Sequence, residues 1–140
     1  MKIELNDSES SSISINGIID VNGGKGVIVE KVVDKGTVLR GQILMGNRQF
    51  VQTAMPNIKL EFFAGIAMNK ATEGNVVFVM VKGVGRMVIH KNSHVIYPCD
   101  NLASTGDGRV GKLWSDGLFQ RLMMAKSVGD GYVDCEINCQ

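Results

Sequence analysis

The sequence is short of proline, of aromatic residues and of an excess of either charge sign. Its 140 residues include 2 prolines, 1 tryptophan and only 6% aromatic residues. The 15 Lys and Arg residues are balanced by 14 Asp and Glu residues, which gives a formal net charge of +1 at pH 7. A chain without a field of one sign has little to attract nucleic acid or an anionic membrane surface. We therefore expect no direct binding of DNA or RNA.

Cysteine is also scarce, and no apolar run is long. Cys99, Cys135 and Cys139 are an odd number, without the dense pairing of small secreted domains, so they favour a reducing compartment. Residues 1–17 lack the charged and apolar regions of an export signal. No apolar run approaches the roughly 18 residues of a membrane span. These absences predict a protein that is made in a cytoplasm and has no membrane partner.

The chain is rich in glycine, with 17 residues, and its apolar segments are mostly valine and isoleucine. Short apolar runs at residues 26–33, 37–45, 86–90 and 94–98 are separated by glycine-containing turn sequences. A turn about every ten residues favours a small barrel or sandwich over a fold of alternating strands and helices. The predicted fold class is therefore all-β.

Two segments predict how their strands are buried. Residues 76–81 (VVFVMV) are apolar at both parities, which predicts a strand covered on both faces. Residues 132–139 alternate between polar and apolar side chains, which predicts a half-buried strand at an edge or on the outside of the sheet. The side chains that we expect to be buried are Val77, Val79, Val81, Val133 and Ile137.

Two other segments, around Phe62 and at residues 116–126, carry apolar side chains at helical spacing. A shift of 56 positions lays residues 62–81 over residues 118–137, and each copy then reads as a strand, a turn and a second strand. We therefore predict strands for both segments, with an internal repeat as a hypothesis. The identical pairs are Phe63 and Phe119, Met68 and Met124, Lys70 and Lys126, and Val77 and Val133.

No pattern in the sequence carries an established chemistry. The glycines lack the Gly-Lys-Ser/Thr ending of a phosphate-binding loop, and neither Gly-x-Ser-x-Gly nor His-Glu-x-x-His occurs. His90 and His94 have the spacing of a zinc pair on a helix, but residues 91–93 between them read as a turn, and no third ligand is near. We expect no catalytic residues, no cofactor and no metal, and so no enzyme.

The N-terminus differs in kind from the rest of the chain. Residues 1–12 are polar and serine-rich, which predicts a flexible arm, and residues 13–140 form a single β-rich domain. Ile3 and Leu5 stand at alternate positions, the pattern of a strand that adds to the open edge of a partner. Trp114 precedes a turn and is either a core residue or an interface anchor. The candidate contact residues are therefore Ile3, Leu5 and Trp114.

Residues 26–45 resemble the opening hairpin of a biotinyl or lipoyl carrier domain. Such carriers present their modified lysine at a tight turn, often within Ala-Met-Lys-Met. This chain has Ala54-Met55-Pro56-Asn57 at the corresponding place, and the next lysine after it is Lys59. The departure predicts a hairpin of related geometry to which no cofactor is attached.

A longer resemblance, over about residues 26–137, is to the small β-rich head decoration proteins of tailed bacteriophages. It is carried by a Gly-x-Val-x-x-Gly strand pair and a Gly-Ile-Ala-x-x-x-Ala-x-x-Gly segment. A valine-rich hairpin, a Tyr-Pro pair before a polar loop, an Asp-Gly-Arg-Val turn and an alternating last strand follow. In this sequence these elements are residues 36–41, 65–74, 76–87, 97–98, 107–110 and 132–139.

The resemblance implies a structural virion protein that binds the outside of an assembled capsid and stabilises it. The implied partner is the major capsid protein, and the implied assembly is a homo-oligomer, with a trimer favoured. It would act on the capsid exterior of the virion, after assembly in the cytoplasm of the bacterial host. A tail or baseplate component is the first alternative. A carrier-like domain without the modified lysine, or an enzyme of an unrecognised barrel class, is further from these observations.

Overall fold

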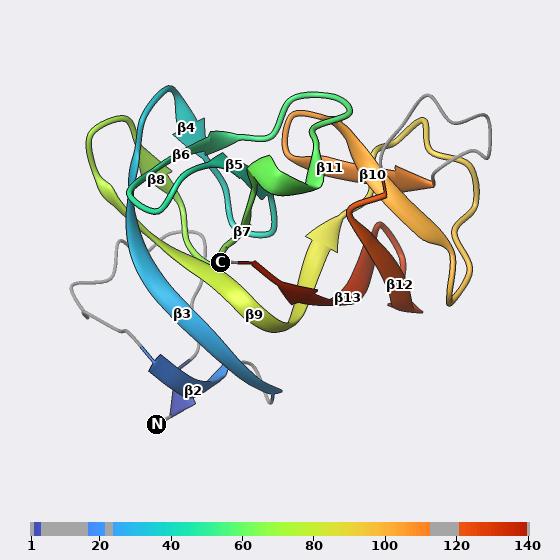
Figure 1. Ribbon diagram of the computed structural model, residues 1–140. Helices are drawn as coiled ribbons and strands as arrows, with labels where there is room; N and C mark the ends of the chain where they lie inside the picture. Colours follow the sequence, from blue (N-terminus) through green and yellow to red (C-terminus); the bar gives the residue numbers. More distant parts are fainter. Residues whose placement is uncertain (1, 4–16, 22–23, 113–120, 140) are drawn as a thin grey trace.

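The computed structural model describes residues 2–3, 17–21, 24–112 and 121–139 (Figure 1). Their regular structure consists of strands and one short 3₁₀ helix, η1 (Leu60–Phe62), so the all-β prediction is confirmed. No helix in this part of the chain is long and apolar enough to cross a membrane. The strands are β1 (Lys2–Ile3), β2 (Gly17–Val21), β3 (Gly24–Val33), β4 (Thr37–Val38), β5 (Ile43–Gly46), β6 (Phe50–Thr53), β7 (Phe63–Ala67), β8 (Ala71–Thr72), β9 (Val76–Val88), β10 (Asn101–Gly106), β11 (Arg109–Lys112), β12 (Met123–Val128) and β13 (Tyr132–Asn138).

Strand pairing closes a ring of five strands in the first half of the chain. The order is β3–β6–β5–β7–β9, and β9 returns to pair with β3. All neighbours are antiparallel except β3 and β6, which are parallel. Of the two predicted architectures, this part of the molecule is therefore a small barrel rather than a sandwich. We call it the first ring.

The long strand β9 continues out of the first ring into a second one. One edge of β9 pairs with β7 at residues 79–80 and with β13 at residues 82–88. The sheet then runs from β13 through β12 and β10 to β11. It returns to the end of β9 by a bridge between Ile89 and Val110, where His90 N–H donates to the Val110 carbonyl at 2.8 Å. In Figure 1 this second ring lies beside the first, with β9 passing from one to the other.

Two apolar clusters follow from this arrangement. The inner cluster fills the first ring with side chains from all five of its strands and from β4 and β8: Val33, Val38, Leu44, Val51, Ala64, Ala67, Ala71, Val77, Val79 and Val81. The shared cluster lies between the rings and within the second; it includes Ile28, Ile66, Phe78, Met80, Met87, Leu102, Met123, Val133, Cys135 and Ile137. Because Val77 and Phe78 face different clusters, β9 is covered on both faces, as residues 76–81 predicted.

The crossing of β7 and β9 is tight. Ala64 is the extra residue of a β-bulge, since Leu44 pairs with Gly65 and Met45 with Phe63. Gly65 has φ +133°, and a Cβ there would collide with the carbonyl oxygen of Met80. Glycine is required at this position for both its conformation and its lack of a side chain.

The alternating segment near the C-terminus is β13, and Val133, Cys135 and Ile137 are buried as the alternation predicted. It is not an edge strand, because β9 and β12 flank it. Its other face carries Tyr132, Asp134, Glu136 and Asn138, which are half-buried or exposed, as the polar side chains predicted. The pattern reports the faces of a strand and contains no information about its two neighbours.

The described parts of both repeat segments form antiparallel strand pairs, β7 with β9 and β12 with β13, although Phe62 itself ends the short helix η1 and residues 116–120 lie outside the described residues. Their registers differ by two residues, because Ala67 pairs with Val79, whereas Ala125 pairs with Cys135. The inward positions 77, 79 and 81 of one copy correspond to 133, 135 and 137 of the other. The copies are alike in strand order and in their inward positions, and they differ in pairing and in the outer face, which is buried at Phe78 and Met80 but not at Asp134 and Glu136.

Candidate interaction surfaces

Of the three predicted contact residues, only Ile3 is among the residues that the structure describes. Ile3 lies in β1, which runs parallel to β2 with Ile3 beside Val21, so the strand belongs to the sheet of its own chain. Leu5, the rest of the arm and Trp114 lie outside the described residues. Their role as contacts stays a prediction.

Few strand edges remain open among the described residues. β6, β5, β7 and β9 each have neighbours on both sides, and so do β13, β12 and β10. The outer edge of β11 is occupied, since Ile89 bridges Val110 and the Lys112 N–H donates to Ser93 Oγ at 3.1 Å. Closing edges in this way prevents indiscriminate strand addition. Contacts made by the two rings must therefore use side chains more than backbone.

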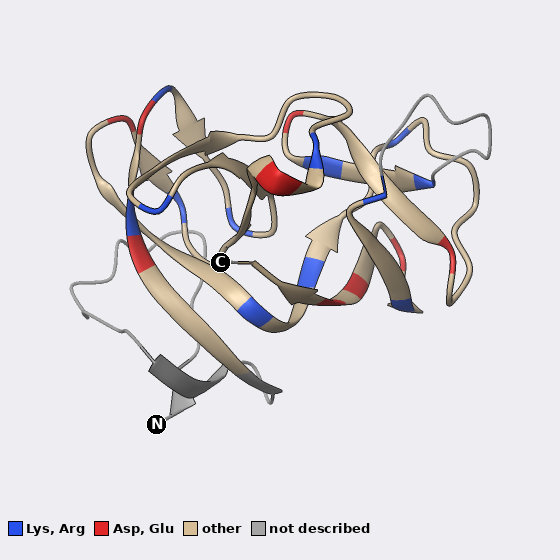
Figure 2. Cartoon of the chain, in the orientation of Figure 1, with Lys and Arg blue, Asp and Glu red and all other residues tan. Residues whose placement is uncertain are grey.

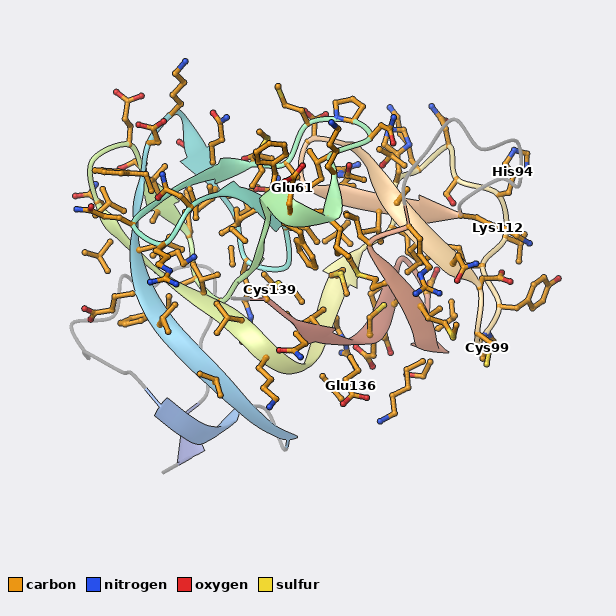
Figure 3. The ribbon with its side chains drawn as sticks, viewed as in Figure 1. Glu61, His94, Cys99, Lys112, Glu136 and Cys139 are labelled. Atoms are coloured by element: carbon orange, nitrogen blue, oxygen red, sulfur yellow. The ribbon has the colours of Figure 1, made fainter. Side chains whose placement is uncertain are left out.

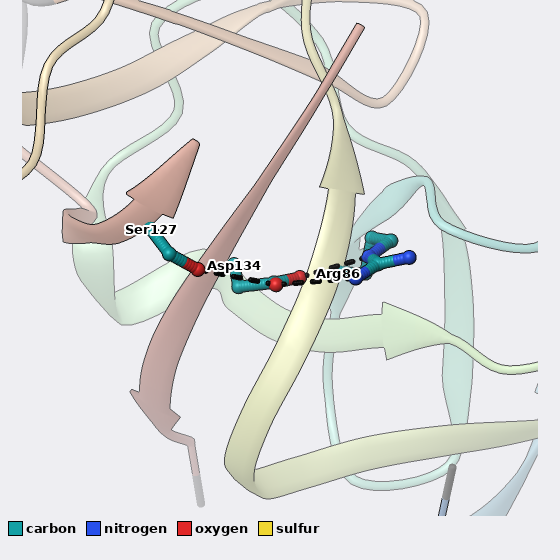
Figure 4. A network of polar contacts seen from close by, with 3 residues as sticks. All are labelled: Arg86, Ser127 and Asp134. Carbon is teal, nitrogen blue, oxygen red and sulfur yellow. Dashed lines mark hydrogen bonds and ion pairs between the residues drawn. The ribbon is translucent and has the colours of Figure 1, made fainter. Parts of the chain in front are cut away.

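Charge does not define a surface either. Figure 2 shows Lys and Arg interspersed with Asp and Glu along the described chain, with neither sign gathered on one element. The ordered charges pair locally: Arg86 forms two hydrogen bonds with Asp134, at 3.0 and 3.3 Å, and Ser127 Oγ donates to the same carboxylate at 3.2 Å (Figure 4). The guanidinium of Arg86 also stacks 3.8 Å from the centre of the Tyr132 ring. This network ties β9, β13 and β12 together across their outer face.

His90 and His94 both line an open cleft of about 220 Å³ beside β10 and β11. Residues 91–93 form the predicted turn: Ser93 N–H donates to the His90 carbonyl at 2.9 Å, and Asn92 N–H donates to His90 Nδ1 at 3.1 Å. Since Nδ1 is an acceptor, a neutral His90 carries its proton on Nε2 and presents a donor, which does not suit a metal. Within the described residues, no three His, Cys, Asp or Glu side chains gather as metal ligands.

Beside this cleft, the loop that follows the histidines is held by local bonds. Tyr97 N–H donates to Asp100 Oδ2 at 2.7 Å, and the same carboxylate lies 3.4 Å from Lys112 Nζ. Cys99 stands at the tip with φ +74° and is exposed, whereas Cys139 lies within the body of the molecule (Figure 3). Burial raises the pKa of the Cys135 thiol to about 12 and that of Cys139 to about 11, so neither is a ready nucleophile.

Lys31 is a charged residue inside the first ring that the sequence did not single out. It is opposite Val77 on β9 and only 4% exposed, and its Nζ donates to the Asn47 carbonyl at 2.8 Å. Desolvation lowers its pKa below the ordinary 10.5, although the nearby Cys139 acts in the opposite direction. The amine ties the turn between β5 and β6 to the inside of the ring.

Exposed apolar side chains form the most distinctive surface features. A cross-strand row on the outside of the first ring consists of Phe50, Val32 and Val76, because Val32 pairs with both of the others. Phe50 and Val76 are exposed, and Val32 is half-buried.

A second group lies on the segment between β6 and β7, residues 54–62, which we call the β6–β7 loop. Met55 is 54% exposed, Leu60 53% and Phe62 48%. Sequence reasoning missed these residues because leucine, methionine and phenylalanine in a mixed segment are also what a core strand contains.

The β6–β7 loop is firmly attached to the second ring. Asn57 N–H donates to the Ser104 carbonyl and Ile58 N–H to Ser104 Oγ, both at 2.8 Å, and Ser104 is fully buried. Ile58 is buried in the shared cluster. Phe62 N–H donates to the Lys59 carbonyl at 2.9 Å and closes the turn of η1. The loop therefore presents its apolar side chains from a rigid base, and Glu61, labelled on η1 in Figure 3, is exposed.

Comparison with known proteins gives a likeness of fold. No protein-family model and no curated protein sequence matches the chain. Among solved structures, it is similar to the N-terminal base of the head fiber protein gp8.5 of bacteriophage phi29, with a TM-score of 0.58. The two chains are 18% identical, and the match covers 79% of this chain and 92% of that one. The chain thus has the fold of a base domain from a phage head fiber.

Proposed function

We propose that this protein is a structural component of a bacteriophage head, which binds the outside of the assembled capsid and stabilises it. The fold that it shares with the base of a phage head fiber is the observation that supports the proposal. The sequence motifs and the likeness of fold both support a structural protein of a phage head. The partner is the major capsid protein.

The physical character of the surface supports a role in assembly. The described strands of the two rings have few open edges, charges of both signs are mixed, and several large apolar side chains are exposed. Exposed apolar groups on a soluble domain often mark surfaces for protein contacts. We extend the proposal to a homo-oligomer, with three copies favoured, and to no catalytic role.

The test is decoration of empty shells. The purified full chain is mixed with DNA-free heads of the phage that encodes it, and bound protein is measured by sedimentation and located by cryo-electron microscopy. We expect density on the outer surface and shells that withstand a higher temperature. Purified tails of the same phage are the control, because binding to tails alone would replace the proposal with a tail or baseplate role.

A further inference from the structure

We propose that the β6–β7 loop is the surface by which this protein docks on the head shell, with Met55, Leu60 and Phe62 as the apolar contacts. This inference rests on the proposed function and adds the location and chemistry of the contact. It concerns side chains for which neither the sequence motifs nor the fold comparison indicates a role.

The first argument is the concentration of exposed apolar surface. Three large side chains, each about half exposed, stand within eight positions of one loop. The exposed part of each side chain contributes little to the stability of the fold. Apolar groups exposed to water favour burial against a partner. Elsewhere among the described residues no stretch of eight positions holds more than two exposed large apolar side chains, as with Val95 and Tyr97, and the row on the first ring has two, Phe50 and Val76.

The second argument is rigidity. The loop is pinned at Asn57 and Ile58 by both the carbonyl and the hydroxyl of the buried Ser104. Pro56 packs against Gly106, where a Cβ would lie 3.3 Å from Pro56 Cγ. A segment that is already ordered loses less conformational entropy when it binds. Apolar side chains on a fixed base are the arrangement expected of interface anchors.

The third argument uses the exposed apolar area of the loop to identify its binding partner. Three half-exposed side chains of this size offer on the order of 300 Å². Two copies meeting through this loop would bury roughly twice that, below the roughly 1,000 Å² of a stable interface. A small contact is sufficient on a shell, because an oligomer that engages several equivalent sites gains affinity through multivalency. The area therefore favours a repetitive surface over a second copy of this chain.

The chemistry of the partner follows from the residues around the anchors. Lys59 and Glu61 are both exposed and flank Leu60 with opposite charges. The matching site on the shell is an apolar depression with both charge signs at its rim. Because the flanking charges cancel, binding should change little with salt, unlike a contact driven by a field of one sign.

The experiment measures binding of full-length variants to the same DNA-free shells. The double variant Leu60→Ser/Phe62→Ser removes two anchors, and the matched control Val95→Ser/Met124→Ser removes two comparably exposed apolar side chains elsewhere. We expect the first to bind at least tenfold more weakly and the control to bind like the wild type. Both should keep the melting temperature of the wild type, since all four side chains are exposed.

Three results would overturn the inference. One is binding of Leu60→Ser/Phe62→Ser within about twofold of the wild type. Another is a wild-type oligomer that dissociates in this variant without shells, which would assign the loop to a second copy. The third is a loss of wild-type binding of more than tenfold between about 0.05 and 0.5 M salt, which would indicate charged contacts instead. If the wild type itself does not bind shells, the proposed function fails, which is a separate result.

Discussion

Gly65 illustrates how a single position permits the approach of β7 to β9. Its φ of +133° is strained for any other residue, and a Cβ would meet the Met80 carbonyl. We expect Gly65→Ala to lower the free energy of unfolding by at least about 2 kcal/mol. Gly74→Ala is the control, because Gly74 also has a positive φ, +84°, but no atom lies within 4 Å of its Cβ position. Its cost should be about 1 kcal/mol, and equal losses in urea titrations would contradict the steric explanation.

Lys31 predicts a pH dependence of stability. Its pKa in the folded protein is below the ordinary 10.5, so the folded state binds fewer protons than the unfolded state between these two values. Stability contributed by this group therefore rises as the pH rises through that range. We expect Lys31→Met to unfold at higher denaturant concentration at pH 7, with a gain on the order of 1 kcal/mol, and the gain should shrink towards pH 10.5.

The quantity to measure is the difference in the free energy of unfolding between the wild type and Lys31→Met at each pH. Cys135 and Cys139 have raised pKa values, so their contribution to stability is present below about pH 9 and is lost as the pH rises further. Lys31 lowers the pKa of Cys139, but both thiols have folded-state pKa values of about 11 or higher, so they stay mostly protonated in folded wild type and Lys31→Met up to about pH 10 and their contribution cancels there. A gain that stays constant from pH 7 to pH 10 would mean that the amine is not desolvated in the folded state.

At the scale of elements, β13 allows the stability contributed by core packing to be compared with that contributed by a surface ion pair. Val133 is fully buried and its neighbour Asp134 joins the outer network with Arg86, whose side chain is 63% exposed. Val133→Ala should cost about 2 kcal/mol, because it leaves a cavity in the shared cluster. Asp134→Asn should cost less than about 1 kcal/mol, because exposed ion pairs contribute little. Thermal unfolding of the two variants tests which stability loss is larger. A larger loss for Asp134→Asn would show that the outer polar network stabilises β13 more than its core packing does.

One of the bonds that attach the β6–β7 loop is made by the buried hydroxyl of Ser104. Ser104→Ala removes the acceptor of the Ile58 N–H and leaves a buried donor unpaired, at a cost of about 1–3 kcal/mol. Amide hydrogen exchange should become faster at Ile58 and remain unchanged in β9. Ser127→Ala is the control, since its hydroxyl is bonded on the exposed outer face. Unchanged protection at Ile58 in Ser104→Ala would mean that the backbone contact to Asn57 is enough.

At the scale of the whole molecule, the two rings should unfold together. They share β9, and the shared cluster joins Ile28 and Phe78 of the first ring with Met87 and Val133 of the second part of the sheet. Met87→Ala should therefore cost about 2–5 kcal/mol and lower hydrogen-exchange protection equally in β3 and β13. A loss confined to β13 would show two independent units.

Much of the fold was predictable from local pattern. The alternation in residues 132–139 and the two-sided apolar run in residues 76–81 predicted which side chains are buried, because the period of a strand assigns each residue to a face. The glycine-rich turns predicted an all-β chain for the same local reason. The likeness to phage head proteins was also suggested by turn and strand motifs, and the fold comparison agrees with it.

Ring closure, strand neighbours and surface anchors depended on tertiary structure. Pairing of β3 with β9 joins residues about fifty positions apart, and no local pattern encodes such a partner. For the same reason the sequence left open whether β13 is an edge strand or an outer strand, and the structure shows β9 and β12 on either side of it. Leu60 and Phe62 have the composition of core residues, yet both are exposed in the loop whose Asn57 and Ile58 dock on Ser104. Sequence alone determined which faces are apolar, whereas tertiary packing decided which of them remain exposed, because burial depends on what the rest of the chain brings alongside.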